Sequence, residues 1–519
     1  MIGLVIRQIW RGALIIAVAA GTVSALVAAG HREFIAGTGT GDFAALAGDP
    51  AIRIMFGEPV ALDDPGGFTV WRTGASLAVL VSAWALLTAT RITRGEEEAR
   101  RWDLLLTGPI TLPKLVARHI AVLVTAACVP GMAAYVALSA MGTGQRGAAL
   151  HGAGIALVGA FFAVVGVFAA QMFPSRAGAT GAAVAVLGVG FGLRMAADAS
   201  VSWLHWSSPF GLLALTRSFA SDRPWPLFVL AFTAGVVAVA TLAVAGRRDL
   251  HNGLSAPRGG RPAQRRLLSS PGAFAVRCMV PSWCGWAVGL GAYYLVMGLL
   301  TGSVTGFLAD NPRFADLAAD AGFTALGSSE GLAATLFSLL AVPAGAFAAV
   351  RIATVAAAES QGRFTLTLAT PVTRARLLVA ETGAALGGVL ALLTVVGSAA
   401  WAGTLSGDTP IAWASALAGA WNTVPIVLLS LGFAVVALGW APGAVTGIGL
   451  LPGAGGFLLF VVARSVDAPA WITGVSPFGH LAAVPREPVD VGGALGMAAI
   501  AAVAAIAGWM GLRRRDLRM

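Results

Sequence analysis

The feature that most constrains this chain is a succession of apolar stretches, each about 20 residues long, separated by shorter polar segments. About 20 apolar residues in a helix are needed to cross the hydrocarbon core of a bilayer. Such stretches lie near 12–29, 73–90, 119–141, 151–172, 178–197, 225–245, 284–302, 331–354, 379–402, 411–438, 443–464 and 489–510. The sequence therefore predicts an all-α polytopic membrane protein with about twelve transmembrane helices.

Composition agrees with this interpretation. Of the 519 residues, 57% are hydrophobic and only 11% are charged, whereas a soluble domain carries about 25% charged residues. A chain this apolar needs lipid as its solvent. Its net charge of +10 does not indicate nucleic-acid binding, because the basic residues lie between apolar stretches rather than on one polar domain.

The distribution of basic residues predicts the orientation. With the N-terminus in the cytoplasm, most of the 34 basic residues fall in loops or at helix ends on the inner side, as the positive-inside rule requires. Both termini are then cytoplasmic. The abundance of Ala, Gly and Arg, with Lys114 as the only lysine, is typical of a G+C-rich bacterial genome. We therefore expect the chain in a bacterial inner (plasma) membrane.

The two halves of the chain repeat one another. Glu97 and Pro109 align with Glu359 and Pro371, an offset of 262 residues in each case. Ser-Pro-Phe-Gly occurs at 208–211 and again at 476–479, and Arg-Asp-Leu at 248–250 and again at 515–517. We predict two pseudo-symmetric six-helix halves, residues 1–250 and 281–519, joined by a cytoplasmic linker at 251–280. Because six spans is an even number, the two halves are parallel repeats.

The predicted cytoplasmic loop between the second and third spans carries charge followed by apolar residues. Glu96, Glu97 and Glu98 precede Arg101 and Trp102, and Gly108-Pro109 ends the run. Acidic residues suit the start of a helix and proline stops one. We predict a short amphipathic helix that docks a partner, with a counterpart near 357–369; an ordinary charged helix end remains the alternative.

The run from Arg94-Gly95-Glu96-Glu97-Glu98 to Leu104-Leu105-Leu106-Thr107-Gly108-Pro109 resembles the loop of ABC-2 type exporter permeases. It is most similar to bacterial multidrug or polyketide-antibiotic efflux permeases with two six-helix halves in one chain. The resemblance implies a separate ABC ATPase subunit, two copies per chain, which binds ATP and Mg. It also implies that these helices couple the two subunits, through Glu96, Glu97, Glu98, Arg101, Trp102, Glu359, Arg363 and Phe364. The second helix departs from the first, since Ser360-Gln361-Gly362 stands where the first has Glu98-Ala99-Arg100.

The chain itself has no nucleotide-hydrolysing motif. A Walker loop needs a lysine after glycine, and Lys114 stands in Leu-Pro-Lys-Leu. The six histidines and three cysteines show no metal-ligand spacing. We therefore expect no enzymatic activity, no metal site and no cofactor in this chain.

Two further groups of residues are candidates for the transport path. Phe191, Arg194, Phe457 and Phe460 lie in the fifth span of each half and are candidates to line a substrate cavity. The aromatic residues could equally face lipid, and Arg194 could snorkel to the interface. The Ser-Pro-Phe-Gly segments resemble the outer re-entrant segment of the exporter family, which makes Pro209, Phe210, Pro477 and Phe478 candidates for an outer gate.

These observations predict the permease subunit of an exporter that moves hydrophobic or amphipathic compounds, such as drugs or antibiotics, out of the cell. The alternative is an ion-driven secondary transporter, which also is commonly built from two six-helix halves. That mechanism needs ionisable residues near the bilayer midplane, and the centres of these spans are almost free of Asp and Glu. A membrane enzyme is a third possibility, but loop acids such as Asp63 and Asp64 are too scattered to support it.

Overall fold

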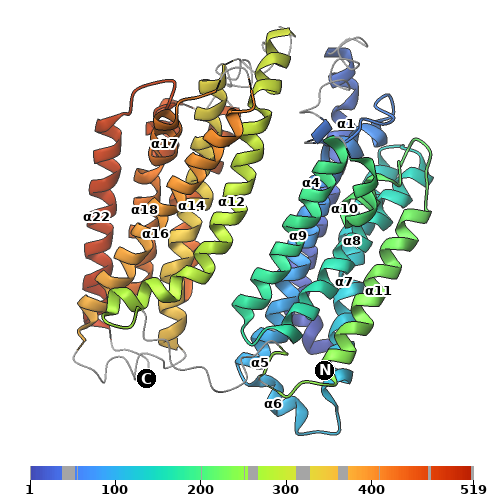
Figure 1. The fold of residues 1–519 in the computed structure, drawn as a ribbon, viewed down its shortest axis with the longest axis horizontal. Coiled ribbons are helices and arrows are strands. Elements are labelled where there is room, and N and C mark those ends of the chain that lie inside the picture. The colour runs from blue at the N-terminus through green and yellow to red at the C-terminus, as the bar shows by residue number, and fades with distance from the viewer. Residues whose placement is uncertain are drawn as a thin grey trace. The chain divides into compact units, whose positions relative to one another are not determined.

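The chain folds into helices that form two compact units, residues 1–261 and 262–519. The structure, a computed structural model, describes residues 2–37, 53–54, 56–199, 201–250, 252–254, 267–310, 328–360, 372–407, 410–465 and 469–515. Within these ranges the regular elements are all helical (Figure 1). Each unit is described by itself below.

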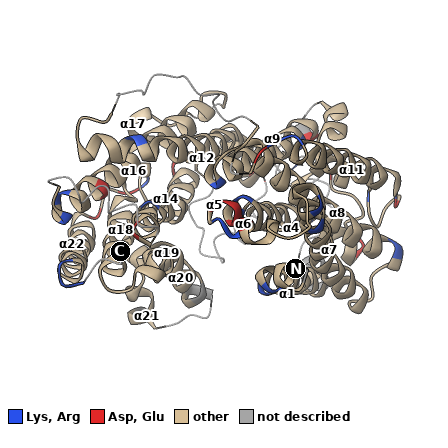
Figure 2. Ribbon diagram, turned by 90° about the horizontal axis from the view of Figure 1, so that it is seen from below, with Lys and Arg blue, Asp and Glu red and all other residues tan. Residues whose placement is uncertain are grey.

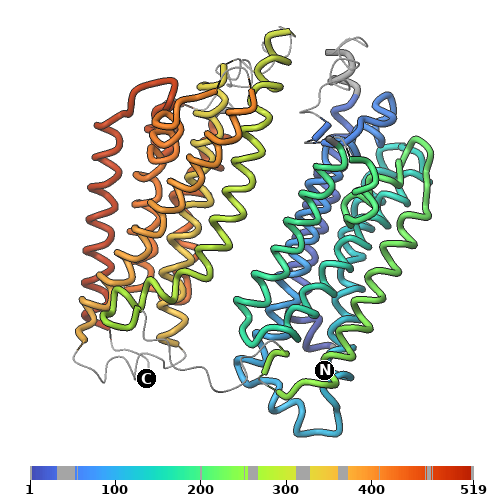
Figure 3. The backbone as a smooth tube through the Cα atoms, viewed as in Figure 1, coloured from blue at the N-terminus to red at the C-terminus, as the bar shows by residue number. Residues whose placement is uncertain are grey.

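The described residues of unit 1 form six long helices, which run side by side in Figure 3. They are α1 (Ile2–Gly37), α4 (Pro65–Thr90), α7 (Leu112–Ala140), α8 (Gln145–Met172), α9 (Arg176–Ala199) and α11 (Trp225–Ala245). Asp64 caps the start of α4 by accepting hydrogen bonds from the backbone N–H groups of Gly66 and Gly67, donors that would otherwise have no partner inside the helix. All six have the length and hydropathy of membrane spans.

Unit 2 repeats this plan with more interrupted helices. Its elements are α12 (Pro271–Asp310), α14 (Ser329–Ser360), α16 (Arg374–Thr404), α17 (Trp413–Trp421), α18 (Val424–Trp440), the 3-10 turn η3 (Pro442–Ala444), α19 (Val445–Leu450), the π-helical turn η4 (Leu451–Gly455), α20 (Gly456–Ser465) and α22 (Val491–Arg514). Six candidate spans arise from them, with α17 and α18 in one and η3 to α20 in another. Over the described residues of both units, twelve candidate spans confirm the predicted all-α polytopic membrane fold.

Equivalent helices pack together in the two units. In unit 1, α1 packs on α7, α4 on α8, and α11 on α8. In unit 2, α12 packs on α16, α14 on α18, and α22 on α18. The fourth span is therefore the central helix of each unit, and the internal repeat seen in the sequence is a repeat of packing as well.

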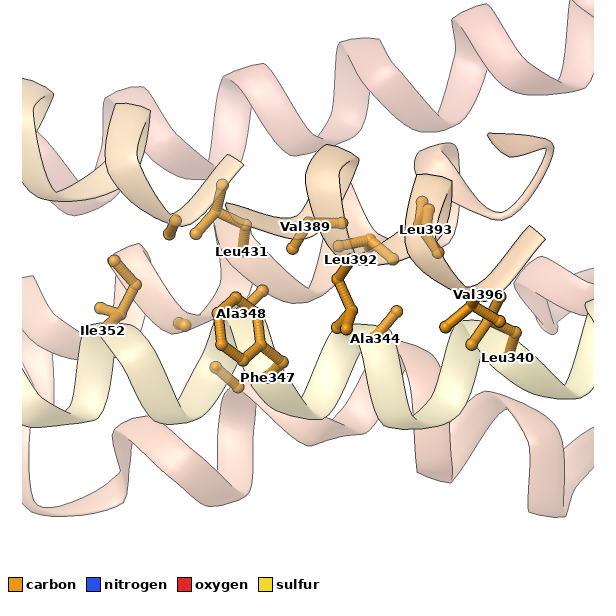
Figure 4. Close-up of a cluster of buried hydrophobic side chains, with 14 of the residues drawn as sticks. Leu340, Ala344, Phe347, Ala348, Ile352, Val389, Leu392, Leu393, Val396 and Leu431 are labelled. Carbon is orange, nitrogen blue, oxygen red and sulfur yellow. The ribbon is translucent and has the colours of Figure 1, made fainter. Parts of the chain in front are cut away.

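The cores of the two units are separate clusters of buried apolar side chains. The largest lies in unit 2, where Leu340, Phe347 and Ile352 of α14 meet Val389 and Leu392 of α16 (Figure 4). Small residues let the helices approach closely. A Cβ atom added to Gly439 of α18 would lie 2.2 Å from the carbonyl oxygen of Gly508 on α22, so only glycine fits at this crossing.

Helix α12 begins earlier than the hydropathy predicts. It starts at Pro271 and continues through Pro281, so the last part of the predicted 251–280 linker is helical. Residues 255–266, the centre of that linker, lie outside the described residues.

Two sets of short helices cap the units and hold the candidate sites. At one end of unit 1, α4 continues through a π-helical turn, η1 (Arg91–Gly95), into α5 (Glu96–Glu98) and α6 (Arg101–Leu106). The opposite end of unit 1 carries η2 (Ser202–Ser207) and α10 (Pro209–Ala214). Within unit 2, the corresponding short helices are α21 (Ala470–Val475) and η5 (Pro477–His480), which precede α22.

Candidate functional site

The predicted docking helix of unit 1 is two short helices rather than one. Helix α5 ends before Arg100, whose φ of 57° lies in the left-handed region, and α6 starts at the next residue. A left-handed residue cannot continue a right-handed helix, so the chain changes direction here. Figure 2 shows charged residues gathered at α5 and α6. We call residues Glu96–Leu106 the α5–α6 segment.

Glu97 lies at the centre of a buried ionic cluster instead of facing outward. Its carboxylate accepts hydrogen bonds from Nη1 and Nη2 of Arg248, at 2.6 and 2.7 Å, and Arg94 lies 3.1 Å away. Arg248 also donates from Nε to Oε1 of Gln171, at 2.8 Å. Glu97 and Arg94 are each 1% exposed, so the predicted contact between Glu97 and a partner subunit is not available in this conformation.

Unit 2 repeats the same ion pair. Nη2 of Arg515 donates to both carboxylate oxygens of Glu359, at 2.7 and 2.6 Å, and Glu359 is 4% exposed. We call Glu97–Arg248 and Glu359–Arg515 the helix-end ion pairs, because each ties the end of the second span to the end of the sixth. The sequence identified all four residues as repeated, but it gave no sign that they are partners.

The other predicted coupling residues of unit 1 divide into anchors and exposed groups. Trp102 is 1% exposed and packs on the His119 ring at a centroid distance of 5.3 Å. Glu98 accepts a hydrogen bond from the backbone N–H of Arg176, at 2.6 Å, at the start of α9. Glu96 pairs with Arg101, whose side chain is 64% exposed.

Helix α6 also carries an exposed residue that is not among the predicted coupling residues. Leu104 is 78% exposed and lies on the same short helix as Arg101. Amphipathic periodicity identified this helix but could not show which of its apolar residues faces the core. In unit 2, Arg363 and Phe364 lie outside the described residues.

At the opposite end, the Ser-Pro-Phe-Gly segments dock in the same way in both units. The Ser208 hydroxyl donates to the carbonyl oxygen of Gly190, at 2.6 Å, and accepts from the backbone N–H of Phe210. The Ser476 hydroxyl donates to the carbonyl oxygen of Gly456, at 2.8 Å, and accepts from the N–H of Phe478. Each serine thus caps its own short helix and attaches it to the fifth span. We call this contact the serine latch.

The predicted cavity and gate residues meet at the latch. Phe191 packs edge-to-face on Phe210 at a centroid distance of 5.6 Å. In unit 2, Phe457 lies 5.5 Å and Phe460 lies 6.4 Å from Phe478. The aromatic residues of the fifth span therefore contact the Ser-Pro-Phe-Gly segment of their own unit. Their role in a transport path stays a prediction. Pro209 and Pro477 begin the two docked turns.

Arg194 is buried, with 3% exposure, and does not snorkel to solvent. Its Nε lies 2.6 Å from Oδ2 of Asp198, and Nε2 of His205 lies 2.9 Å from the other carboxylate oxygen. The hydrogen bond to Asp198 raises the pKa of His205 above its ordinary value, against the opposing effect of burial. The three side chains of Arg194, Asp198 and His205 thus connect α9 to the η2 turn. Asp198 and His205 were not among the predicted site residues.

Comparison with known proteins agrees with the fold and the predicted resemblance. Residues 268–513 match the model of a family described as the C-terminal domain of the multidrug efflux system permease Rv1217c. The chain is also 29% identical over 471 residues to the multidrug efflux system permease protein Rv1217c of Mycobacterium tuberculosis (strain ATCC 25618 / H37Rv). That alignment covers 90% of this chain and 85% of the relative. The resemblance to exporter permeases is therefore confirmed.

Proposed function

We propose that this chain is the membrane-spanning subunit of an ABC-2 type exporter, driven by two copies of a separate ATPase subunit that bind ATP and Mg. The exposed face of the α5–α6 segment is the observation that carries this proposal. It offers Arg101 and Leu104 on a support held by a buried ion pair. A charged group beside an exposed apolar anchor suits a protein partner.

The orientation inferred from the basic residues places the α5–α6 segment in the cytoplasm, where ATP is available, together with both termini. ATP-driven closure of the partner subunits would press on this segment. The helix-end ion pair would then pass the movement to the second and sixth spans together, because it joins their ends. The serine latches lie at the opposite, outer end, where the substrate leaves.

The proposed substrates are hydrophobic or amphipathic compounds, including drugs. The relative is a multidrug efflux permease by its name, and the candidate spans of this chain are predominantly apolar. The described acids within the spans do not favour ion coupling. Asp198, Glu359 and Glu381 each pair with an arginine, as does Glu97. All the described acids of the spans lie within about two turns of a helix end rather than at the centre; besides these four, they are Glu96, Glu98, Asp310 and Glu330.

The test is co-expression of the full chain with candidate ABC ATPases, followed by purification in lipid nanodiscs. We expect two ATPase subunits per chain and ATP hydrolysis that rises when the chain is present. Leu104→Ala should weaken the complex about tenfold, the effect of losing an anchor residue. Leu26→Ala, which removes another exposed leucine from α1, is the matched control and should have no effect.

A chain that binds none of these ATPases, and that moves solute along an ion gradient when purified alone, would overturn the proposal in favour of a secondary transporter. Equal binding by the Leu104→Ala variant and the unmodified chain would instead show that the ATPase contacts another surface.

A further inference from the structure

Unit 1 contains a cavity of about 130 Å³ at its Ser-Pro-Phe-Gly end. Its wall is built by α4, α8, α9, η2, α10 and the chain around Gly57 and Thr216. Arg217 and Glu58 line it and form an ion pair whose side chains are 38% and 53% exposed. Because these two residues reach solvent while others of the wall are buried, the cavity is accessible from this end of the unit.

One buried polar group in the wall has no partner. His151 of α8 is fully buried, and neither of its ring nitrogens has a hydrogen-bond partner in the part of the chain that the structure describes. An imidazole offers one N–H donor and one acceptor in either neutral tautomer. A buried polar group without a partner is costly, so a histidine here indicates that something in the cavity bonds to it.

The other polar groups of the wall are already paired with one another. Arg194 pairs with Asp198, Asp198 with His205, and Arg217 with Glu58. Since both arginines and both carboxylates have a counter-charge within the wall, a charged ligand would have to break an existing pair. The wall therefore suits a neutral ligand.

Size and shape limit the ligand further. A dry protein cavity of about 150 Å³ holds one benzene molecule, so this cavity is the size of one aromatic ring. Phe56, Trp71 and Phe210 line it and provide aromatic surfaces, which favour stacked or edge-to-face ring contacts. A ring with one hydrogen-bonding substituent satisfies both the apolar wall and His151.

Unit 2 does not repeat the arginine of this wall. Arg194 follows the latch glycine Gly190 by four residues, whereas Phe460 occupies the same place after the latch glycine Gly456. Phe460 packs near Phe478, so an aromatic side chain takes the place of the arginine. The repeat has therefore diverged at this position, which fits a site that only one unit needs.

We propose that this cavity is a binding site for a neutral compound with a single aromatic ring and a hydrogen-bonding substituent, with His151 as the partner of that substituent. The site differs from the exposed α5–α6 segment and does not depend on ATP. It lies beyond the proposed function, which concerns only the energy source and the general class of exported compound.

Phenol is the probe, with benzene as the ring that lacks the substituent. Binding is measured by titration calorimetry on the full chain in lipid nanodiscs, and the heat from empty nanodiscs is subtracted. We expect one saturable phenol site per chain. His151→Leu should lower phenol affinity about tenfold while leaving benzene affinity unchanged, because only the hydrogen bond is lost. His119→Leu, which changes a buried histidine outside the cavity, should leave both affinities unchanged.

A second variant tests the cavity without touching the histidine. Ala75 lines the cavity, and Ala75→Leu should fill it and abolish the binding of both rings. If His151→Leu does not fold, the Ala75→Leu variant still tests whether the rings bind in this cavity. The inference would be overturned if the full chain showed no saturable phenol binding above the uptake by empty nanodiscs, which is the result expected for a cavity that holds only water. Saturable binding unchanged by Ala75→Leu would overturn it as well. Neither ATPase nor transport is involved, so the proposed function is tested separately.

Discussion

At the scale of single residues, the helix-end ion pairs are the best-defined feature of the chain. Glu97 and Arg248 are separated by 151 residues and Glu359 and Arg515 by 156, yet in both pairs the arginine donates to both carboxylate oxygens. Removing one partner of a buried pair leaves an uncompensated charge, which costs about 3–5 kcal/mol. An exposed pair contributes only about 0–1 kcal/mol.

Glu97→Gln should therefore lower the melting temperature of the full chain in nanodiscs clearly, because Arg248 loses its counter-charge. Glu96→Gln is the matched control, since Glu96 is the neighbouring glutamate and its partner Arg101 is largely exposed. It should shift the melting temperature little. Equal shifts in the two variants would contradict a structural role for Glu97 and would favour a role in contact with a partner subunit.

The sequence repeat singles out Glu97 and Glu359, but it does not show that both side chains are buried in ion pairs. Self-similarity shows that Glu97 and Glu359 are equivalent, but equivalence does not say which groups touch. The partner of Glu97 lies on a different helix far along the chain, and no periodicity links Glu97 to Arg248. The exposure of Leu104 could not be predicted for a related reason. The break at Arg100 sets the direction of α6, and no glycine marks this break in the sequence.

At the scale of elements, the serine latch attaches a short turn to the fifth span in each unit. The two latches differ in the space around the glycine that supplies the carbonyl. A Cβ atom on Gly456 would lie 2.9 Å from Cδ of Pro477, whereas one on Gly190 would lie 3.6 Å from Cδ of Pro209. The first distance is a clash with a rigid ring, and the second is an ordinary van der Waals contact.

Gly456→Ala should therefore move the Ser-Pro-Phe-Gly segment of unit 2 away from its helix and destabilise the chain by about 1–3 kcal/mol, the range for overpacking. Gly190→Ala is the control and should be neutral or slightly stabilising, because alanine favours a helix over glycine. Thermal unfolding of both variants in nanodiscs measures the difference. A larger loss in Gly190→Ala than in Gly456→Ala would mean that the two latches do not have this geometry.

Hydropathy predicted the spans well because burial in lipid demands long apolar stretches, and each stretch corresponds to a candidate helical span. It did not predict where the helices end. Backbone hydrogen bonding continues through polar residues beyond the apolar part, so α12 starts at Pro271 rather than near 284. The π-helical turns η1 and η4 also have no simple signature in hydropathy.

At the scale of the whole molecule, the repeat extends from sequence to packing and to both ion pairs. Among the described residues, every cluster of buried apolar side chains lies within one unit: three clusters draw only on unit 1 and two only on unit 2. In the part of the chain that the structure describes, each unit also has six candidate spans, an even number that predicts both of its ends on the same side of the membrane. A unit thus has the core and the topology that it needs to insert by itself.

Cutting the chain between the units should therefore preserve both folds. Co-expressed pieces 1–261 and 262–519 should insert in the membrane and melt near the temperature of the intact chain, because the cut divides no core cluster. The control cut follows Gly142, in the turn between α7 and α8. It separates Leu123 from Ala163, which share a cluster, and should lower the yield of folded protein. Equal yields from both cuts would show that the units are not the independent parts of this fold.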